Sequence, residues 1–146
     1  MAIPEQETTW TTSHIGPARF RTEIRSRDHF FVADEPFSVG GRDAGPTPYE
    51  LLLASLGACT AMTLRMYADR KQWPLQDVRV RLRTSGSHAE DCVKCEEDEV
   101  GMTTVEREVE LSGPLTDEQR TRLLEIADRC PIKQTLARGV RVVAAR

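Results

Sequence analysis

The sequence predicts an α+β fold in which a mostly antiparallel sheet packs against a few helices. Two segments, residues 77–85 and 103–111, alternate strictly between apolar and charged side chains, as half-buried strands do. A third segment is long and apolar and begins with a helix-capping motif at Thr47. The chain has 146 residues and no internal repeat or long linker, so we expect one domain over residues 1–146.

The N-terminal third is expected to contain short strands. Residues 1–17 suit an N-terminal extension or an edge strand. Residues 18–24 and 29–34 are rich in aromatic and β-branched side chains, and the polar RSRD between them indicates a hairpin loop. The sequence GGRDAGP that follows at 40–46 is typical of a turn.

A long helix is predicted from Pro48 to about Lys71. Thr47 and Glu50 have the spacing of a capping box, and Pro48 stands at the first helical position, where its missing N–H costs nothing. A Trp-Pro pair shortly after Lys71 directs the chain out of helical geometry. The first four turns are apolar nearly all round, which indicates burial on every side. Because so short a chain has little to cover such a helix, we expect two copies to associate through it.

The two alternating segments are expected to pair as antiparallel neighbours. One presents three arginines and the other three glutamates to solvent, and each cross-strand ion pair is worth roughly 0.2 to 1 kcal/mol. The charged residues are Arg79, Arg81 and Arg83 against Glu106, Glu108 and Glu110. The polar segment between the strands, residues 86–101, is interpreted as an acidic loop that carries a CxxC motif.

The C-terminal part is predicted to contain two helical segments and a strand. A second capping box, from Thr116 to Gln119, opens a helix over residues 117–129. This helix ends at a Cys-Pro pair, and a short helical turn over 131–139 follows. The sequence VRVVAA at 140–145 predicts a last strand.

Composition excludes several classes of function. The chain has 20 Lys and Arg against 23 Asp and Glu, a formal net charge of −3 and no basic cluster, so we expect no nucleic-acid partner. The first twenty residues lack an apolar signal segment and no long uncharged apolar run follows, so we expect a cytoplasmic protein without a membrane partner. Four cysteines without a secretory signal favour redox or metal chemistry over a disulfide scaffold.

Two of the cysteines stand in contrasting local settings. Cys59 lies within the long apolar helix, and the small residues Gly57 and Ala58 leave room beside its sulfur. It is either a small core side chain or a reactive thiol. Cys130 precedes a proline that suits the first turn of a helix, so it is either an N-cap, where free N–H groups favour a thiolate, or a buried cysteine that ends the preceding helix.

The other two cysteines, Cys92 and Cys95, form the CxxC motif of the acidic loop. One CxxC supplies two ligands where a structural zinc site needs four, and His88 with Asp91 would complete only a poor site. Free thiols, a reversible local disulfide and a metal site all stay open, although we expect no metal. The acidic residues of the loop disfavour ionisation of both thiols.

Three stretches together resemble the OsmC/Ohr family of osmotically inducible and organic hydroperoxide resistance proteins. They are GPTPYELLLASLGACTAMTL at 45–64, RMYADRKQWPLQDVRVRL at 65–82 and IADRCPIKQTL at 126–136. The resemblance covers roughly residues 18–146 and follows the family's order of motifs. It implies an OsmC-like fold, with mostly antiparallel sheets wrapped around two long central helices in an intertwined homodimer and active sites at the subunit interface.

The resemblance implies a cysteine-based thiol peroxidase that reduces organic hydroperoxides without a metal or flavin cofactor. Cys59 matches the family's peroxidatic cysteine and Cys130 its resolving cysteine. A Cys59 sulfenate would then form an intramolecular disulfide with Cys130, and an external dithiol would reduce it. The alternative is a dimeric binding protein for a small apolar molecule, without peroxidase activity, in which Cys59 only lines an interface pocket.

The resemblance also implies charged groups near the peroxidatic sulfur. Hydroperoxide resistance proteins use an arginine from an early strand or hairpin and a glutamate directly after the helix-starting proline. In this chain the second position holds Tyr49, and the carboxylate follows at Glu50, about 100° further around the helix. Glu50 is therefore both a cap and a candidate site residue. The candidate arginines are Arg19, Arg21, Arg25 and Arg27.

Overall fold

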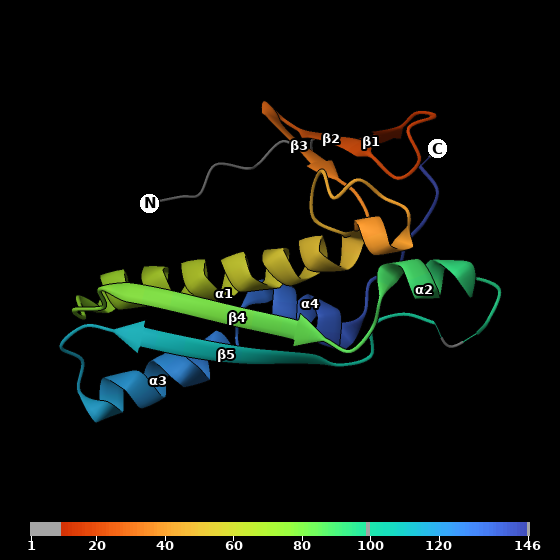
Figure 1. The fold of residues 1–146 in the computed structure, drawn as a ribbon. Coiled ribbons are helices and arrows are strands. Elements are labelled where there is room, and N and C mark those ends of the chain that lie inside the picture. The colour runs from red at the N-terminus through yellow and green to blue at the C-terminus, as the bar shows by residue number, and fades with distance from the viewer. Residues whose placement is uncertain (1–9, 99, 146) are drawn as a thin grey trace. The chain divides into compact units, whose positions relative to one another are not determined.

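The computed structural model describes residues 10–98 and 100–145, so residues 1–9 of the expected N-terminal extension lie outside the described part of the chain. The described chain combines helices with antiparallel strands (Figure 1). This combination confirms the predicted α+β class.

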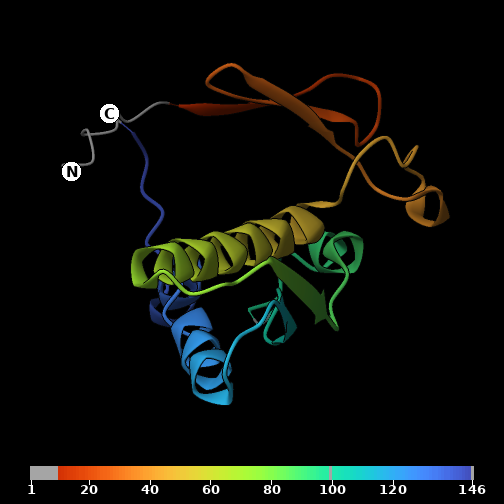
Figure 2. The same ribbon diagram turned by 90° about the vertical axis from the view of Figure 1, so that its left-hand side faces the viewer.

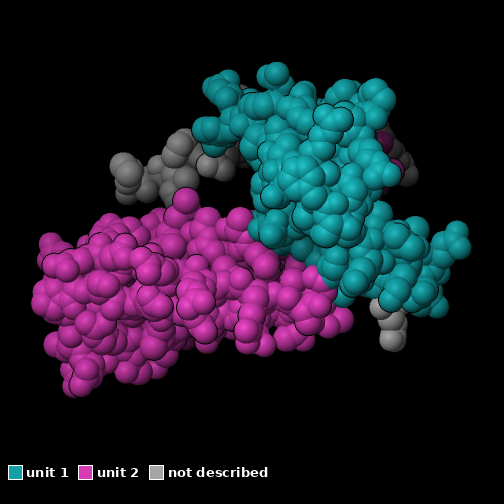
Figure 3. Space-filling model, in the orientation of Figure 1, with its two compact units in different colours: residues 1–51, 87–101 teal, residues 52–86, 102–146 magenta. Residues whose placement is uncertain are grey.

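The chain divides into two compact units, each with a small sheet of its own (Figure 3). The first unit consists of residues 1–51 and 87–101, and the second of residues 52–86 and 102–146. The long helix runs from the end of one segment into the other, so its first turn belongs to the first unit.

Three antiparallel strands form the sheet of the first unit, in the order β1-β2-β3 with β1 at an edge. They are β1 (Thr11–Ile15), β2 (Thr22–Ser26) and β3 (His29–Ala33). Ser26 pairs with His29 across a tight turn that includes Arg27, as the hairpin prediction required. However, β2 begins at Thr22 and not at residue 18, because Arg19 has a φ of 51° that interrupts extended backbone.

The first unit also contains two short helical segments, η1 (Phe37–Val39) and α2 (His88–Val93). The prediction of a continuous loop over 86–101 was wrong, since α2 forms its first part. The stretch HAEDCV contains no glycine or proline that would oppose a helix. His88 contacts Glu35, a residue far from it in the sequence, and this contact holds the first turn of α2 in place.

Helix α1 (Pro48–Lys71) has the bounds predicted from the sequence. The backbone N–H of Thr47 donates to Glu50 Oε2 at 2.7 Å, and the N–H of Glu50 donates to Thr47 Oγ1 at 3.3 Å. Both bonds of the capping box are therefore present.

In the second unit, α1 and α3 (Asp117–Ala127) pack on the sheet formed by β4 (Asp77–Thr84) and β5 (Val105–Ser112) (Figures 1 and 2). The core is built from aliphatic side chains that these elements and their connecting loops contribute. Its buried members are Leu64, Ala68, Leu75, Leu115, Leu123, Ile126 and Ala127. The apolar face that each element showed in the sequence is the face that reaches this core.

The predicted pairing of β4 with β5 is confirmed, with antiparallel register along the whole length of both strands. Arg83 Nη2 lies 2.5 Å from Glu106 Oε2, and Arg81 Nη1 lies 3.1 Å from Glu108 Oε2. The third pair, Arg79 with Glu110, is longer at 3.9 Å. The alternating charges thus form a ladder on the solvent face of the sheet.

The helices near the C-terminus follow their capping signals. Thr116 accepts a bond from the backbone of Gln119 and the reciprocal bond is present, so α3 has its predicted capping box. Helix α4 (Pro131–Arg138) begins with Cys130 as its N-cap residue and proline in its first turn. These starts follow from residues within one turn of each helix.

Helix α1 is buried on one face within the described chain, and cover of its other face by a second copy stays a prediction. Its buried residues are Leu56, Gly57, Thr60, Leu64 and Ala68. Met62 and Met66 are 65% and 68% exposed, since one sheet can cover only one face of a helix. By length and composition alone α1 could cross a membrane, a test that core helices of soluble proteins also pass.

The last strand predicted at 140–145 is not a strand in the described chain. Val140, Val142 and Val143 are 67%, 91% and 69% exposed. The segment pairs with neither sheet, and extended backbone becomes a β-strand only when another strand accepts its hydrogen bonds.

Candidate active site

Cys59 and Cys130 come together in the second unit, at the start of α4. Cys59 lies in the middle of α1, and Cys130 is the N-cap of α4. The backbone N–H of Ile132 donates to Cys59 Sγ, and that of Lys133 donates to Cys130 Sγ, each across 3.5 Å. The two thiols are also close enough for each to shift the pKa of the other. One helix start therefore binds both sulfurs.

The two sulfurs differ in their access to solvent. Cys130 is completely buried, whereas Cys59 is half-buried. Beside Cys59, a Cβ atom added at Gly57 would lie 2.9 Å from Cδ1 of Leu82, so the missing side chain is what lets α1 approach β4 this closely. This close approach confirms the role predicted for the small residues around Cys59. A small molecule would reach Cys59 first.

The surroundings move the pKa values of the two thiols in opposite directions. Burial is the largest influence on Cys59 and raises the pKa of its thiol, and the neighbouring Cys130 adds to that effect. Burial is also the largest influence on Cys130 and acts upward. The hydrogen bonds from Lys133 N–H and from Cys59 together outweigh it, so the pKa of Cys130 lies below its ordinary value. The structure therefore supports the thiolate-favouring N-cap rather than an inert buried cysteine.

The basic side chains near α4 bind a carboxylate. Lys133 Nζ donates to Asp128 Oδ1 at 2.8 Å, and Arg107 donates to the same oxygen at 2.8 Å. The bond from Lys133 is the main reason that the pKa of Asp128 is lowered. Among the hydrogen bonds of the described residues, those to Cys59 and Cys130 come from backbone N–H groups and from side chains without charge.

The candidate arginines all belong to the first unit. Arg19 donates to the carbonyl oxygen of Gly40 at 3.1 Å, and Arg21 pairs with a glutamate two residues further on at 2.6 Å. Arg25 lies over a phenylalanine ring of β3, and Arg27 stands in the hairpin turn. That one of these arginines approaches Cys59 stays a prediction, and the sequence did not choose among the four.

The first turn of α1 carries the other sequence candidate and a residue that sequence reasoning left without a role. Glu50 is held by the capping box at its own helix start. Tyr49, which stands where hydroperoxide resistance proteins carry glutamate, donates through its hydroxyl to the Asp91 carboxylate of α2. This bond raises the pKa of Tyr49. The ring of Tyr49 also meets the ring of His88 edge-on, with centroids 5.6 Å apart.

The cysteines of the CxxC motif lie elsewhere, in and just after α2. Cys92 and Cys95 are both free thiols and exposed. Within residues 10–98 and 100–145, no group of three His, Cys, Asp or Glu side chains is arranged to hold a metal ion. His88 Nδ1 instead lies within hydrogen-bond distance of Oε1 of Glu35, a residue that no sequence motif had marked.

Comparisons with known proteins agree with this architecture. The family model described as OsmC-like protein matches residues 40–144. A search of curated proteins found no match. An OsmC-like protein from Mycoplasma pneumoniae has a similar structure, with a TM-score of 0.73 and 18% identity over 91% of this chain and 89% of that one.

Two similar structures belong to hydroperoxide resistance proteins. The organic hydroperoxide resistance protein OsmC from Legionella pneumophila has a TM-score of 0.65 and 21% identity, over 90% of both chains. The organic hydroperoxide resistance protein OhrB of Bacillus subtilis has a TM-score of 0.56 and 20% identity, over 88% of this chain and 90% of that one. At these identities the similarity shows a shared fold.

Proposed function

The chain belongs to the OsmC-like protein family, and from this membership we propose that it is a thiol peroxidase that reduces organic hydroperoxides with Cys59 and Cys130. A peroxide-related role is supported by the family and by the fold shared with hydroperoxide resistance proteins. The more specific assignment as a thiol peroxidase rests on the pair of thiols, Cys59 and Cys130.

The observation that carries this proposal is that both thiols lie at the start of α4, where the N–H groups of Ile132 and Lys133 donate to Cys59 and Cys130. A lone buried cysteine would be a core side chain. Two free thiols at one helix start, each receiving a backbone N–H and each shifting the pKa of the other, have the arrangement that a disulfide-forming site needs.

The reaction begins with a proton transfer between the two thiols. Cys130 ionises more readily than Cys59, so its thiolate can take the proton of Cys59, and the Cys59 thiolate then attacks the outer oxygen of the hydroperoxide. A sulfur–oxygen bond forms, the oxygen–oxygen bond breaks, and the alkoxide leaves as an alcohol after taking up a proton. Cys59 is now a sulfenic acid.

Cys130 then completes the cycle. Its thiolate attacks the sulfenic sulfur, a disulfide forms, and hydroxide leaves as water with a proton. An external dithiol reduces the disulfide by exchange and restores both thiols. The sulfur atoms carry the electrons, so the proposal needs neither metal nor flavin.

Accessibility assigns the two roles. The lowered pKa of Cys130 would suit a nucleophile, but its side chain is completely buried and no peroxide could reach it. Cys59 is half-buried and receives an N–H from Ile132. This difference supports Cys59 as the peroxidatic sulfur and Cys130 as the resolving one.

The working molecule is proposed to be a cytoplasmic homodimer. The exposed face of α1 that includes Met62 and Met66 is the surface on which a second copy would pack. A charged group from an early arginine would then offset the burial that raises the pKa of Cys59.

The test is peroxide reduction by the purified protein with cumene hydroperoxide and a dithiol reductant. In a Cys92→Ser/Cys95→Ser background, which removes the other two thiols, we expect Cys59→Ser to abolish turnover. Cys130→Ser should still allow one oxidation event, trapped as a dimedone adduct of Cys59, and should lose turnover. Equal activity in the wild type and in Cys59→Ser would refute the proposal and leave the alternative of a small-molecule binding protein.

A further inference from the structure

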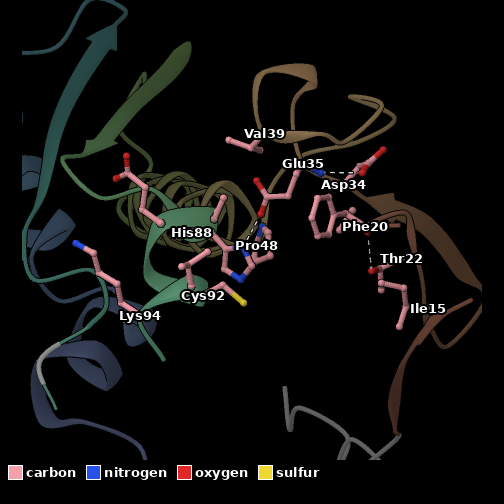
Figure 4. Close-up of a pocket in the computed structure, with 14 residues that line it drawn as sticks. Ile15, Phe20, Thr22, Asp34, Glu35, Val39, Pro48, His88, Cys92 and Lys94 are labelled. Carbon is pink, nitrogen blue, oxygen red and sulfur yellow. Dashed lines mark hydrogen bonds and ion pairs between the residues drawn. The ribbon is translucent and has the colours of Figure 1, made fainter. Parts of the chain in front are cut away.

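The second pair of cysteines lies beside a cavity that the proposed reaction at Cys59 does not use. The cavity has a volume of about 650 Å³ and is formed within the first unit (Figure 4). Cys92 lines it and Cys95 does not. Its size falls in the range of pockets that hold small molecules.

The walls of the cavity are mostly apolar. β1, the segment before β2 and the loop after β3 contribute one side, and α2 contributes the other (Figure 4). The apolar lining includes Ile15, Phe20, Val39, Ala89 and Val93. Such walls select molecules with a hydrocarbon body.

A histidine and a buried carboxylate complete the wall next to Cys92. His88 precedes Cys92 by one helical turn, so both side chains stand on one face of α2, and both line the cavity. His88 Nδ1 lies 2.5 Å from Glu35 Oε1, and Glu35 is only 6% exposed. With Nδ1 held by Glu35, Nε2 is the nitrogen left to exchange a proton.

Further contacts hold the histidine in this position. The ring of Tyr49 meets the ring of His88 edge-on, and the Tyr49 hydroxyl donates to Asp91 on α2. The ring of His88 is therefore fixed from two sides. A thiol, a fixed imidazole and a carboxylate that orients the imidazole are the parts of an activated nucleophile.

We propose that Cys92 is a second hydroperoxide-reactive thiol, activated by His88, fed through the apolar cavity and resolved by Cys95. The identity of the oxidant rests on the proposed function, since an organic hydroperoxide is the substrate that function supplies. The thiol site itself rests on the cavity and on the pairing of His88 with Glu35.

The reaction at Cys92 begins when His88 Nε2 takes the proton of the thiol, and the resulting thiolate attacks the outer peroxide oxygen. A sulfur–oxygen bond forms, the oxygen–oxygen bond breaks, and the alkoxide takes the proton back from His88 to leave as an alcohol. Cys95 then attacks the sulfenic sulfur, so that a disulfide and one water are formed.

The position of Cys95 just beyond the helix suits this last step. Residues three apart on a helical turn lie about 5 to 6 Å apart at Cβ, whereas the Cβ atoms of a disulfide lie about 3.5 to 4.5 Å apart, so the two cysteines must move closer to bond. α2 ends at Val93, so Cys95 lies in the turn beyond it and can adjust without unwinding the helix.

The test uses the Cys59→Ser/Cys130→Ser variant, in which Cys92 and Cys95 are the remaining thiols of the four. One equivalent of cumene hydroperoxide should consume both thiols, yield one cumyl alcohol and give a Cys92–Cys95 disulfide by peptide mass spectrometry. If the serine variant is not folded by circular dichroism, Cys59→Ala/Cys130→Ala replaces it. Survival of both thiols in a folded variant overturns the proposal.

The two cysteines serve as matched controls for each other. In the Cys59→Ser/Cys130→Ser background, adding Cys95→Ser leaves Cys92 as the remaining thiol, and adding Cys92→Ser leaves Cys95. Cys92 should form a sulfenate at least about tenfold faster than Cys95, because only Cys92 has a base and a cavity. Equal rates overturn the proposal. His88→Gln retains an amide N–H for Glu35 but cannot take up a proton, so it should slow Cys92 oxidation by at least about tenfold.

Cavity filling tests the substrate class. Ala89→Leu should lower the ratio of the Cys92 rate with cumene hydroperoxide to its rate with hydrogen peroxide. An unchanged ratio would mean that the cavity does not feed Cys92. These measurements are made without Cys59, so they fail or succeed independently of the dimedone test on Cys59 in Cys130→Ser.

Discussion

The backbone N–H of Ile132 donates a hydrogen bond to the sulfur of Cys59 across 3.5 Å, and so ties the middle of α1 to the first turn of α4. The next N–H in the chain, that of Lys133, binds Cys130. Both sulfurs thus lie in the positive field of one helix start. This arrangement makes the pair, and not either cysteine alone, the unit that ionises.

The ionisation of the pair can be measured in a Cys92→Ser/Cys95→Ser background. We expect one thiolate below the ordinary thiol range and a second above it, because the pKa of Cys130 is lowered and that of Cys59 is raised. Ultraviolet absorbance of the thiolate against pH would show two steps. A single step at the ordinary value would contradict the assignment.

Removing one partner gives the sign of the coupling. The bond from Cys59 lowers the pKa of Cys130, so Cys59→Ala should raise the pKa of the remaining thiol and move its titration to higher pH. The bond from Lys133 N–H persists in this variant and acts as the internal reference. A titration that stays in place would show that the two sulfurs do not interact.

The CxxC motif is expected to leave the first step at Cys59 alone. The residues that shift the pKa of Cys59 are Ile132, Cys130 and Thr63, none of which belongs to the motif. Replacement of both Cys92 and Cys95 by serine should therefore change the rate of Cys59 sulfenate formation by less than about twofold. Stopped-flow oxidation followed by dimedone trapping measures that rate. A larger loss would mean that the motif takes part in the first oxidation.

The exposed face of α1 predicts an obligate homodimer. Met62 and Met66 are one helical turn apart and 65% and 68% exposed, and burying such a pair against a second copy removes their surface from water. Met62→Glu/Met66→Glu should give monomer or aggregate by light scattering at micromolar concentration, whereas Met62→Leu/Met66→Leu, which keeps this face apolar, should remain dimeric. A stable folded monomer of the wild-type chain would refute the prediction.

Two arginines of the β4–β5 sheet should differ in their effect on stability. Arg81 and Glu108 are each 68% exposed, so Arg81→Ala should lower the free energy of unfolding by less than about 1 kcal/mol. Arg107 is only 17% exposed and donates to Ala127 O at 3.0 Å and to Asp128 at 2.8 Å. Arg107→Ala should therefore cost about 1 to 3 kcal/mol.

Urea unfolding of the two variants measures this difference. The effect of Arg81→Ala should shrink further in high salt, because exposed ion pairs are screened. The effect of Arg107→Ala should persist, since one of its acceptors is a backbone carbonyl. Equal costs for both variants would mean that exposure does not decide the value of these ion pairs.

Local signals allowed several features to be predicted from the sequence. Thr47 and Glu50 fixed the start of α1, because both partners of a capping box lie within one turn. The alternating arginines and glutamates fixed the pairing of β4 with β5, because side chains of one strand face alternate sides of a sheet. The Cys-Pro pair predicted Cys130 as an N-cap, because the N-cap residue and the proline of the first turn are adjacent in the chain.

Predictions that depended on a distant neighbour were less accurate. The strand expected at 140–145 found no partner in the described chain. Helix α2 was missed because its composition is that of a loop, and what holds it is a bond from His88 to Glu35. The sequence did contain one signal for this helix, since the spacing of His88 and Cys92 places both side chains on one helix face.

The sequence by itself therefore determined the family, the α+β class, the long helix and the cysteines worth testing, since each depends on residues close together in the chain or on motifs in a fixed order. Only the tertiary structure decided that Cys59 and Cys130 meet at one helix start and that His88 meets Glu35. Contacts of this kind arise when whole helices and strands pack their apolar faces together. Packing distances between remote segments are not written in any local pattern.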